Sequence, residues 1–80
     1  IMSQKLIIID DDTPFRERLG RSMEKKGFFV ETFSSYHDCL DRCVQVTFDY
    51  AIVDMRLEDG SGLELIKKLK EVSPNTKSLL

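Results

Sequence analysis

The stretch L-I-I-I-D-D-D-T-P-F, residues 6–15, decides the fold of this chain. Its first four residues form a continuous aliphatic run. Such a run is typical of a strand that is buried on both faces in a parallel sheet, and we expect this strand from Lys5 to Ile9. Three aspartates follow directly. Thr13 and Pro14 then predict a helix start, because a hydroxyl can cap the helix and proline in its first turn costs no hydrogen bond.

The alternation of strand and helix patterns continues to the end of the chain. The first helix is expected to end at Gly27 and to turn one apolar stripe toward the core, formed by Phe15, Leu19 and Met23. Further strands are expected at 28–33, at 50–53 and from 77, and further helices are expected after the caps Ser35 and Ser61, the second with Leu63, Ile66 and Leu69 facing inward. Residues 1–80 are therefore predicted to form a single domain, a doubly wound α/β fold with a parallel sheet.

The strand order of such a fold locates a site. The flavodoxin-like order 2-1-3-4-(5), here truncated after the start of the fourth strand, places strands 1 and 3 side by side and the ligand crevice at their carboxyl ends. Asp10 and Asp11 follow the first strand, and Asp54 follows the third. Carboxylates that converge repel one another unless a cation neutralises them, and an all-oxygen ligand set favours Mg²⁺.

Asp54 is the candidate nucleophile of this crevice, since it alone ends the central strand. A carboxylate beside Mg²⁺ can attack phosphorus and form an aspartyl phosphate. A solvated strand end with a helix-capping role would account for one acid, such as Asp12, but less well for all of them.

Composition excludes several classes of protein. Hydrophobic residues make up 41% of the chain and charged residues 32%, with a net charge of −2, so the chain should fold and offers no basic face for nucleic acid. No apolar run approaches the roughly 20 residues of a membrane span or forms a signal peptide. Cys39 and Cys43, four residues apart on a predicted helix, seldom reach disulfide geometry, which favours a reduced, cytoplasmic protein with two small buried side chains. The sequence leaves open whether either cysteine is redox-active.

Two segments resemble the receiver domains of bacterial two-component response regulators. They are L-I-I-I-D-D-D-T-P-F-R (6–16) and Y-A-I-V-D-M-R-L-E-D-G-S-G-L-E-L-I (50–66). The features that resemble the family are the acidic pair, the acid that ends strand 3, the D-G-x-G loop and the intervals between them. The resemblance covers essentially all 80 residues. The stretch M-E-K-K-G-F (23–28), together with D-M-R-L-E-D-G-S-G-L-E (54–64), further resembles the RegA/PrrA/ActR type of redox-responding regulator.

The resemblance implies a CheY-like signalling module rather than an enzyme. Asp54 would be the phosphoacceptor, taking its phosphoryl group from a sensor histidine kinase. Asp10 and Asp11 would bind Mg²⁺ with Asp54 and the backbone carbonyl of Arg56. A DNA-binding output domain would lie outside this chain and control transcription. Gly60 and Gly62 would form a tight turn with unusual backbone angles, although an ordinary loop position explains Gly62 equally well.

Two expected groups are missing from these residues. Receivers carry a Ser or Thr at the end of strand 4 and a Lys at the end of strand 5, and both positions would lie beyond Leu80. We therefore expect an N-terminal part of a receiver. An exposed edge at strand 3 or 4 would invite pairing with a second copy, through dimer contact or strand exchange.

The exposed side of the first helix is a candidate surface for kinase docking. Because the apolar stripe of this helix is expected to face the core, the exposed side would be formed by Pro14, Arg18, Arg21 and Ser22. An ordinary solvated helix face explains the same pattern equally well.

Two other functions compete with the phosphorylated switch. A haloacid-dehalogenase-like phosphatase also carries acids after its first strand, but its pattern resembles D-x-D-x-T, and Thr13 arrives one position early. A pseudo-receiver, a docking module of the same fold that never carries phosphate, is disfavoured by the intact acids.

Overall fold

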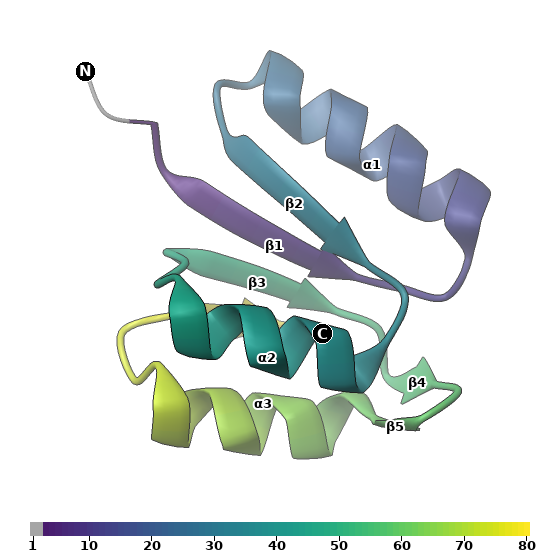
Figure 1. The fold of residues 1–80 in the computed structure, drawn as a ribbon. Coiled ribbons are helices and arrows are strands. Elements are labelled where there is room, and N and C mark those ends of the chain that lie inside the picture. The colour runs from purple at the N-terminus through teal and green to yellow at the C-terminus, as the bar shows by residue number, and fades with distance from the viewer. Residues whose placement is uncertain (1–2) are drawn as a thin grey trace.

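The computed structural model describes residues 3–80 and contains a four-stranded parallel sheet. The strands are β1 (Lys5–Ile9), β2 (Phe29–Phe33), β3 (Tyr50–Val53) and β6 (Lys77–Leu79), in the order β2-β1-β3-β6. Helix α1 (Thr13–Lys25) covers one face of the sheet, while α2 (Tyr36–Gln45) and α3 (Gly62–Val72) cover the other (Figure 1). The predicted doubly wound α/β fold and its strand order are confirmed.

The main core lies between the sheet and the pair α2 and α3. Ile7 and Ile9 of β1 belong to it, while the alternate residues Leu6 and Ile8 are buried toward α1. The core also contains the following buried side chains: Cys39, Cys43, Phe48, Ala51, Val53, Leu65 and Leu69. Strand β1 is thus buried on both faces, which is the environment that its unbroken aliphatic run predicts.

The helix caps differ from expectation at one helix only. Ser35 and Ser61 cap α2 and α3 by accepting hydrogen bonds from backbone amides, as predicted. At α1 the cap is Asp12, whose Oδ1 accepts from the amide of Phe15 at 3.1 Å. The prediction of Thr13 as the cap was wrong: the helix begins at Thr13 itself, one residue earlier than predicted, so the preceding carboxylate of Asp12 is the group placed to cap it.

The apolar stripes of α1 and α3 are less buried than the sequence predicts. Phe15 is 45% exposed, and Leu19 and Met23 are only partly buried. Two grooves leave part of this sheet face uncovered: Phe15 and Leu19 line one of about 240 Å³, and Met23 lines another of about 390 Å³. In α3, Leu65 is buried in place of Leu63, which is 53% exposed. Gly62, Leu65 and Leu69 are the buried residues of α3, and they lie three and four positions apart on one side of the helix.

A short hairpin between β3 and α3 was not predicted. It pairs β4 (Arg56–Leu57) with β5 (Gly60–Ser61). Asp59 lies in the turn of this hairpin. Its carboxylate accepts hydrogen bonds from Ser35 Oγ at 2.8 Å and from the backbone amides of Tyr36 and His37 at 2.8 and 3.3 Å. These bonds, chiefly the one from Tyr36, hold the pKa of Asp59 below its usual range. The hairpin is therefore tied to the start of α2.

Gly60 and Gly62 are needed for space and not for unusual backbone angles. In the described residues a positive φ occurs at Gly27, at 101°, and at neither of these two glycines, so that part of the prediction was wrong. A Cβ on Gly62 would lie 2.1 Å from the backbone oxygen of Asp54, and one on Gly60 would lie 2.7 Å from the ring of Tyr36. The amide of Gly62 also donates to the carbonyl of Met55 at 2.9 Å.

The cysteines are buried free thiols, as predicted. The hydrogen bond with Cys43, together with burial, raises the pKa of the Cys39 thiol. Cys39 is therefore held in the un-ionised form, which is the unreactive one.

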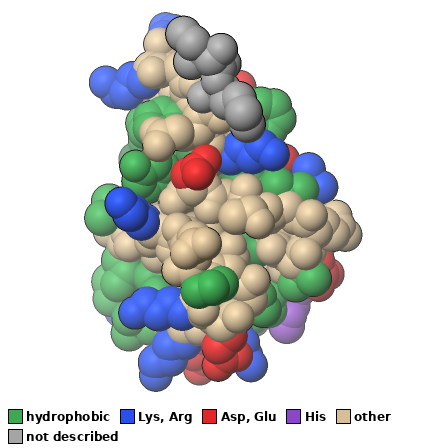
Figure 2. Space-filling view, turned by 90° about the vertical axis from the view of Figure 1, so that its left-hand side faces the viewer, with side chains coloured by type: hydrophobic (Ala, Val, Ile, Leu, Met, Phe, Trp, Pro, Cys, Tyr) green, Lys and Arg blue, Asp and Glu red, His purple; other side chains and the backbone are tan. Residues whose placement is uncertain are grey.

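Charges are dispersed over the end of the molecule where the strands begin. Figure 2 shows this end, with basic and acidic side chains interspersed among apolar and neutral ones. Within residues 3–80, no helix has the length and apolar character that crossing a bilayer requires.

The substitution Gly62→Ala is expected to destabilise the fold. Its methyl group would overlap backbone atoms of Asp54 and Met55, which cannot move without disturbing β3, so we expect a loss of about 1–3 kcal/mol in the free energy of unfolding. Urea titration followed by circular dichroism measures this loss.

Gly20→Ala is the matched control for this substitution. Its Cβ would meet Thr32 at an ordinary 3.4 Å, and alanine gains about 1 kcal/mol of helix propensity at an interior position. Equal stability of the Gly62→Ala variant and the parent protein would contradict the close packing described here.

Candidate functional site

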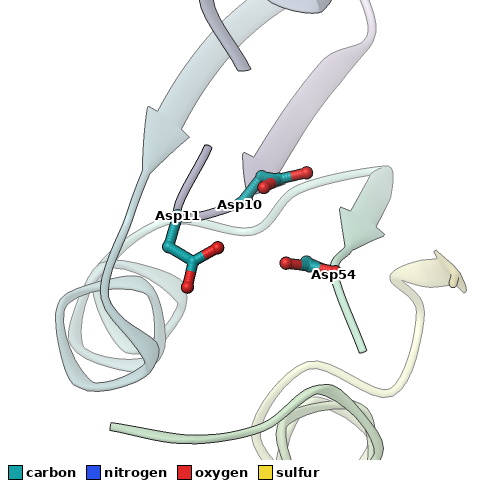
Figure 3. Close-up of side chains that lie close together, drawn as sticks. All are labelled: Asp10, Asp11 and Asp54. Carbon is teal, nitrogen blue, oxygen red and sulfur yellow. The ribbon is translucent and has the colours of Figure 1, made fainter. Parts of the chain in front are cut away.

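Three aspartates converge at the carboxyl end of the sheet, as the sequence predicts. Asp10, Asp11 and Asp54 each offer a carboxylate oxygen, and these oxygens all lie within 4.8 Å of one another. Figure 3 shows Asp11 and Asp54 reaching toward one another, with Asp10 beside them. Asp10 and Asp54 are half-buried and Asp11 is exposed, so the cluster opens to solvent.

The parallel pairing of β1 with β3 produces this convergence. Ile9 lies opposite Val53 in the register, so the next residues of both strands, Asp10 and Asp54, leave the sheet at the same level. The amide of Asp54 continues the ladder by donating to the carbonyl of Ile9 at 2.9 Å. On the other side, the amide of Asp10 donates to the carbonyl of Phe33 at 3.0 Å.

The β1–α1 loop is held by its own polar groups. The amide of Asp12 donates to Asp10 Oδ1 at 2.9 Å, while the carboxylate of Asp12 caps α1. Arg16 Nη1 donates to the backbone carbonyl of Asp10 at 2.6 Å. Asp12 is therefore a structural residue, in agreement with the capping role considered for it, and the carboxylates of Asp10 and Asp11 are left to form the cluster.

The electrostatics of the cluster favour a cation. Burial raises the pKa of Asp10 above its usual range, the charges of Asp54, Asp11 and Asp12 raise it further, and the hydrogen bond from the Asp12 amide partly offsets these effects. A divalent ion would offset the repulsion. The donor atoms are carboxylate oxygens without sulfur or imidazole, a set that fits Mg²⁺ or Ca²⁺.

The other predicted site residues lie outside the carboxylate cluster. Arg56 is exposed and begins β4, two residues past Asp54. The proposed docking residues are all exposed on α1; they are Pro14, Arg18, Arg21 and Ser22. Their roles toward a metal ion and a kinase remain predictions.

Two residues with structural roles at the site were missed by the sequence analysis. Arg16 reaches back from α1 to the end of β1, and no periodic pattern marks such a contact. Asp59 ties the hairpin to α2. The dipeptide Asp59-Gly60, a common turn signal, could have pointed to the hairpin but not to this contact.

Comparison with known proteins agrees with this geometry. The sequence-family model of the response regulator receiver domain matches residues 6–80 of this chain. The photosynthetic apparatus regulatory protein RegA of Cereibacter sphaeroides is 42% identical over 72 residues, which are 90% of this chain and 39% of RegA. The acid tolerance regulatory protein ActR of Rhizobium meliloti is 36% identical over 77 residues, covering 96% of this chain and 40% of ActR.

A solved structure shows the same fold. It is a response regulator from Burkholderia pseudomallei with a phosphorylated aspartic acid, a calcium ion and citrate. The TM-score is 0.89 at 28% sequence identity, over 95% of this chain and 45% of that one. The family model, the relatives and the fold agree with the three converging aspartates: the chain belongs to the response regulator receiver domain family.

Proposed function

We propose that Asp54 accepts a phosphoryl group from a sensor histidine kinase, with Mg²⁺ held by Asp10, Asp11, Asp54 and the backbone carbonyl of Arg56. The observation that carries the proposal is the approach of the three carboxylates to within 4.8 Å. Receiver domains act as signalling modules in two-component systems, so the proposal concerns which residues of this chain perform that role. The phosphorylated aspartic acid and calcium ion of the Burkholderia regulator support the same chemistry here.

The position of Asp54 suits an in-line transfer. Its half-buried carboxylate follows the end of β3 and reaches toward the exposed Asp11 (Figure 3), a side from which a phosphohistidine can approach. An Asp54 oxygen forms the new bond to phosphorus while the bond from phosphorus to the imidazole nitrogen breaks, and that nitrogen retains the electron pair. When bound, Mg²⁺ would screen the charge between the carboxylate and the phosphoryl oxygens.

The alternatives considered from the sequence have less support. Membership of the receiver family and the strand order β2-β1-β3-β6 argue against the phosphatase. The intact acidic cluster argues against a pseudo-receiver. The chain spans about two fifths of the curated relatives RegA and ActR, and we propose that the full-length protein carries a DNA-binding output domain and acts in the cytoplasm.

The substitution Asp54→Asn should abolish phosphorylation. In the full-length protein with Mg²⁺ and a small acyl-phosphate donor, we expect a base-labile acyl phosphate on the parent and none on the variant, because the amide is a poor nucleophile. Labelling is measured by mass spectrometry. Asp41→Asn, an exposed change on α2 with the same loss of charge, should retain labelling. Labelling of the Asp54→Asn variant at the parent level would exclude Asp54 as the acceptor.

The substitution Asp10→Asn should stabilise the metal-free protein at neutral pH. The raised pKa of Asp10 means that its charged form is disfavoured in the fold, so folding takes up a proton as the pH falls through this pKa. The gain from Asp10→Asn is therefore largest at neutral pH and shrinks in acid, which thermal unfolding in EDTA at several pH values can measure. A gain that grows as the pH falls would contradict this account. Saturating Mg²⁺ should reverse the order of stability, because the parent binds the ion more tightly.

The docking proposal for Pro14, Arg18, Arg21 and Ser22 predicts a selective defect. The double change Arg18→Glu/Arg21→Glu should slow phosphotransfer from the cognate kinase by roughly 10-fold or more at low salt, because two exposed charges are reversed. Labelling by the small donor should not change. The control is Lys25→Glu/Lys26→Glu, which makes the same charge change at the far end of α1. An equal defect in this control would mean that net charge, and not this surface, affects the transfer.

A further inference from the structure

We infer that Arg16 is a positioning residue for the metal-binding loop: through the backbone carbonyl of Asp10, it orients both Asp10 and Asp11. The inference rests on the proposed function, because it concerns how these two carboxylates are held for a divalent ion.

The contacts of Arg16 span the loop from the helix back to the strand. Its Nη1 donates to the carbonyl oxygen of Asp10 at 2.6 Å, and its Nη2 donates to Thr13 Oγ1 at 3.4 Å. Its Nε is buried and finds no hydrogen-bond partner within residues 3–80. The half-buried guanidinium is thus held by its two terminal nitrogens, a forked contact that the single ammonium of lysine cannot reproduce.

The carbonyl of Asp10 is an effective place to fix the loop. It belongs to the peptide group that joins Asp10 to Asp11, and this group is planar. Holding the carbonyl therefore restricts the directions in which both side chains leave the backbone. The amide of Asp10 is fixed by Phe33 and its Oδ1 by the amide of Asp12, so Arg16 supplies the third restraint.

Arg16 acts through the backbone and not through an ion pair with the cluster. Within the described residues, the salt bridges join Glu31 to Arg42 and Lys68 to Glu71, and neither includes Arg16. This distinction decides whether removing Arg16 should raise or lower the affinity for a cation. If Arg16 acted only by its positive charge, removing it would strengthen binding of a cation. If Arg16 positions the ligands, removing it weakens binding, and changes in groups that orient metal ligands typically cost 10- to 100-fold in affinity.

The test compares Arg16→Met with Lys25→Met in the full-length, metal-free protein. Methionine retains an apolar stem but has no donor, and Lys25→Met removes the same charge from an exposed site on the same helix. Titration with Mg²⁺, followed by NMR, should show a roughly 10-fold weaker affinity for Arg16→Met. The affinity of Lys25→Met should equal that of the parent or slightly exceed it. Arg16→Lys, which keeps one charged donor, should fall between the parent and Arg16→Met.

Hydrogen exchange gives a readout that needs no metal. The amide of Asp12, which donates to Asp10 Oδ1, should exchange faster in Arg16→Met and Arg16→Lys, while the amides of β1 and β3 keep their protection. If Arg16→Met does not fold, Arg16→Lys tests the inference by the same two measurements, the Mg²⁺ affinity and the exchange rate of the Asp12 amide. Affinity and Asp12 exchange at the parent level would overturn the inference, and so would tighter Mg²⁺ binding. Failure of the parent to bind Mg²⁺ would instead overturn the proposed function.

Discussion

The parallel pairing of β1 with β3 is the interaction on which the site depends. Four register positions, ending at Ile9 and Val53, align the two strands so that Asp10 and Asp54 emerge side by side. A shift of β1 by one residue would turn its side chains to the opposite face and would move Ile7 and Ile9 out of the main core. Because Ile9 and Val53 are almost fully buried, the core holds this register and, with it, the spacing of the carboxylates.

The loops beyond the strands are held mainly by contacts outside the carboxylate cluster; the exception is the amide of Asp12, which donates to Asp10 Oδ1. Asp12 and Arg16 fix the first loop through the cap of α1 and the carbonyl of Asp10. Asp59 ties the hairpin after Asp54 to the start of α2, and Gly62 lets α3 begin against the backbone of Asp54. Each of these contacts uses a backbone group or a side chain outside the cluster.

The sequence predicted what depends on local patterns and strand order. The aliphatic run of β1 indicated a strand buried on both faces, and topology then placed Asp10 and Asp54 together. The errors arose where a choice depends on three-dimensional packing. Whether Asp12 or Thr13 caps α1 depends on the residue at which that helix starts, and whether Leu63 or Leu65 faces the sheet depends on how α3 is rotated about its axis. Exposure of the stripe on α1 depends on how much of that sheet face is covered, and periodicity carries no information about this.

The raised pKa of Asp10 and the anchored loops have a common consequence for ion binding. Crowded carboxylates would move apart if their loops were free, and a cation would then have to order them at a cost in conformational entropy. Here the strand ladder and the loop contacts resist that separation, so the repulsion is retained in the metal-free fold. Binding of a divalent ion would then remove a repulsion that already exists and would need to order little of the chain. The same groups that lower the stability of the free protein would therefore increase the affinity of the proposed site.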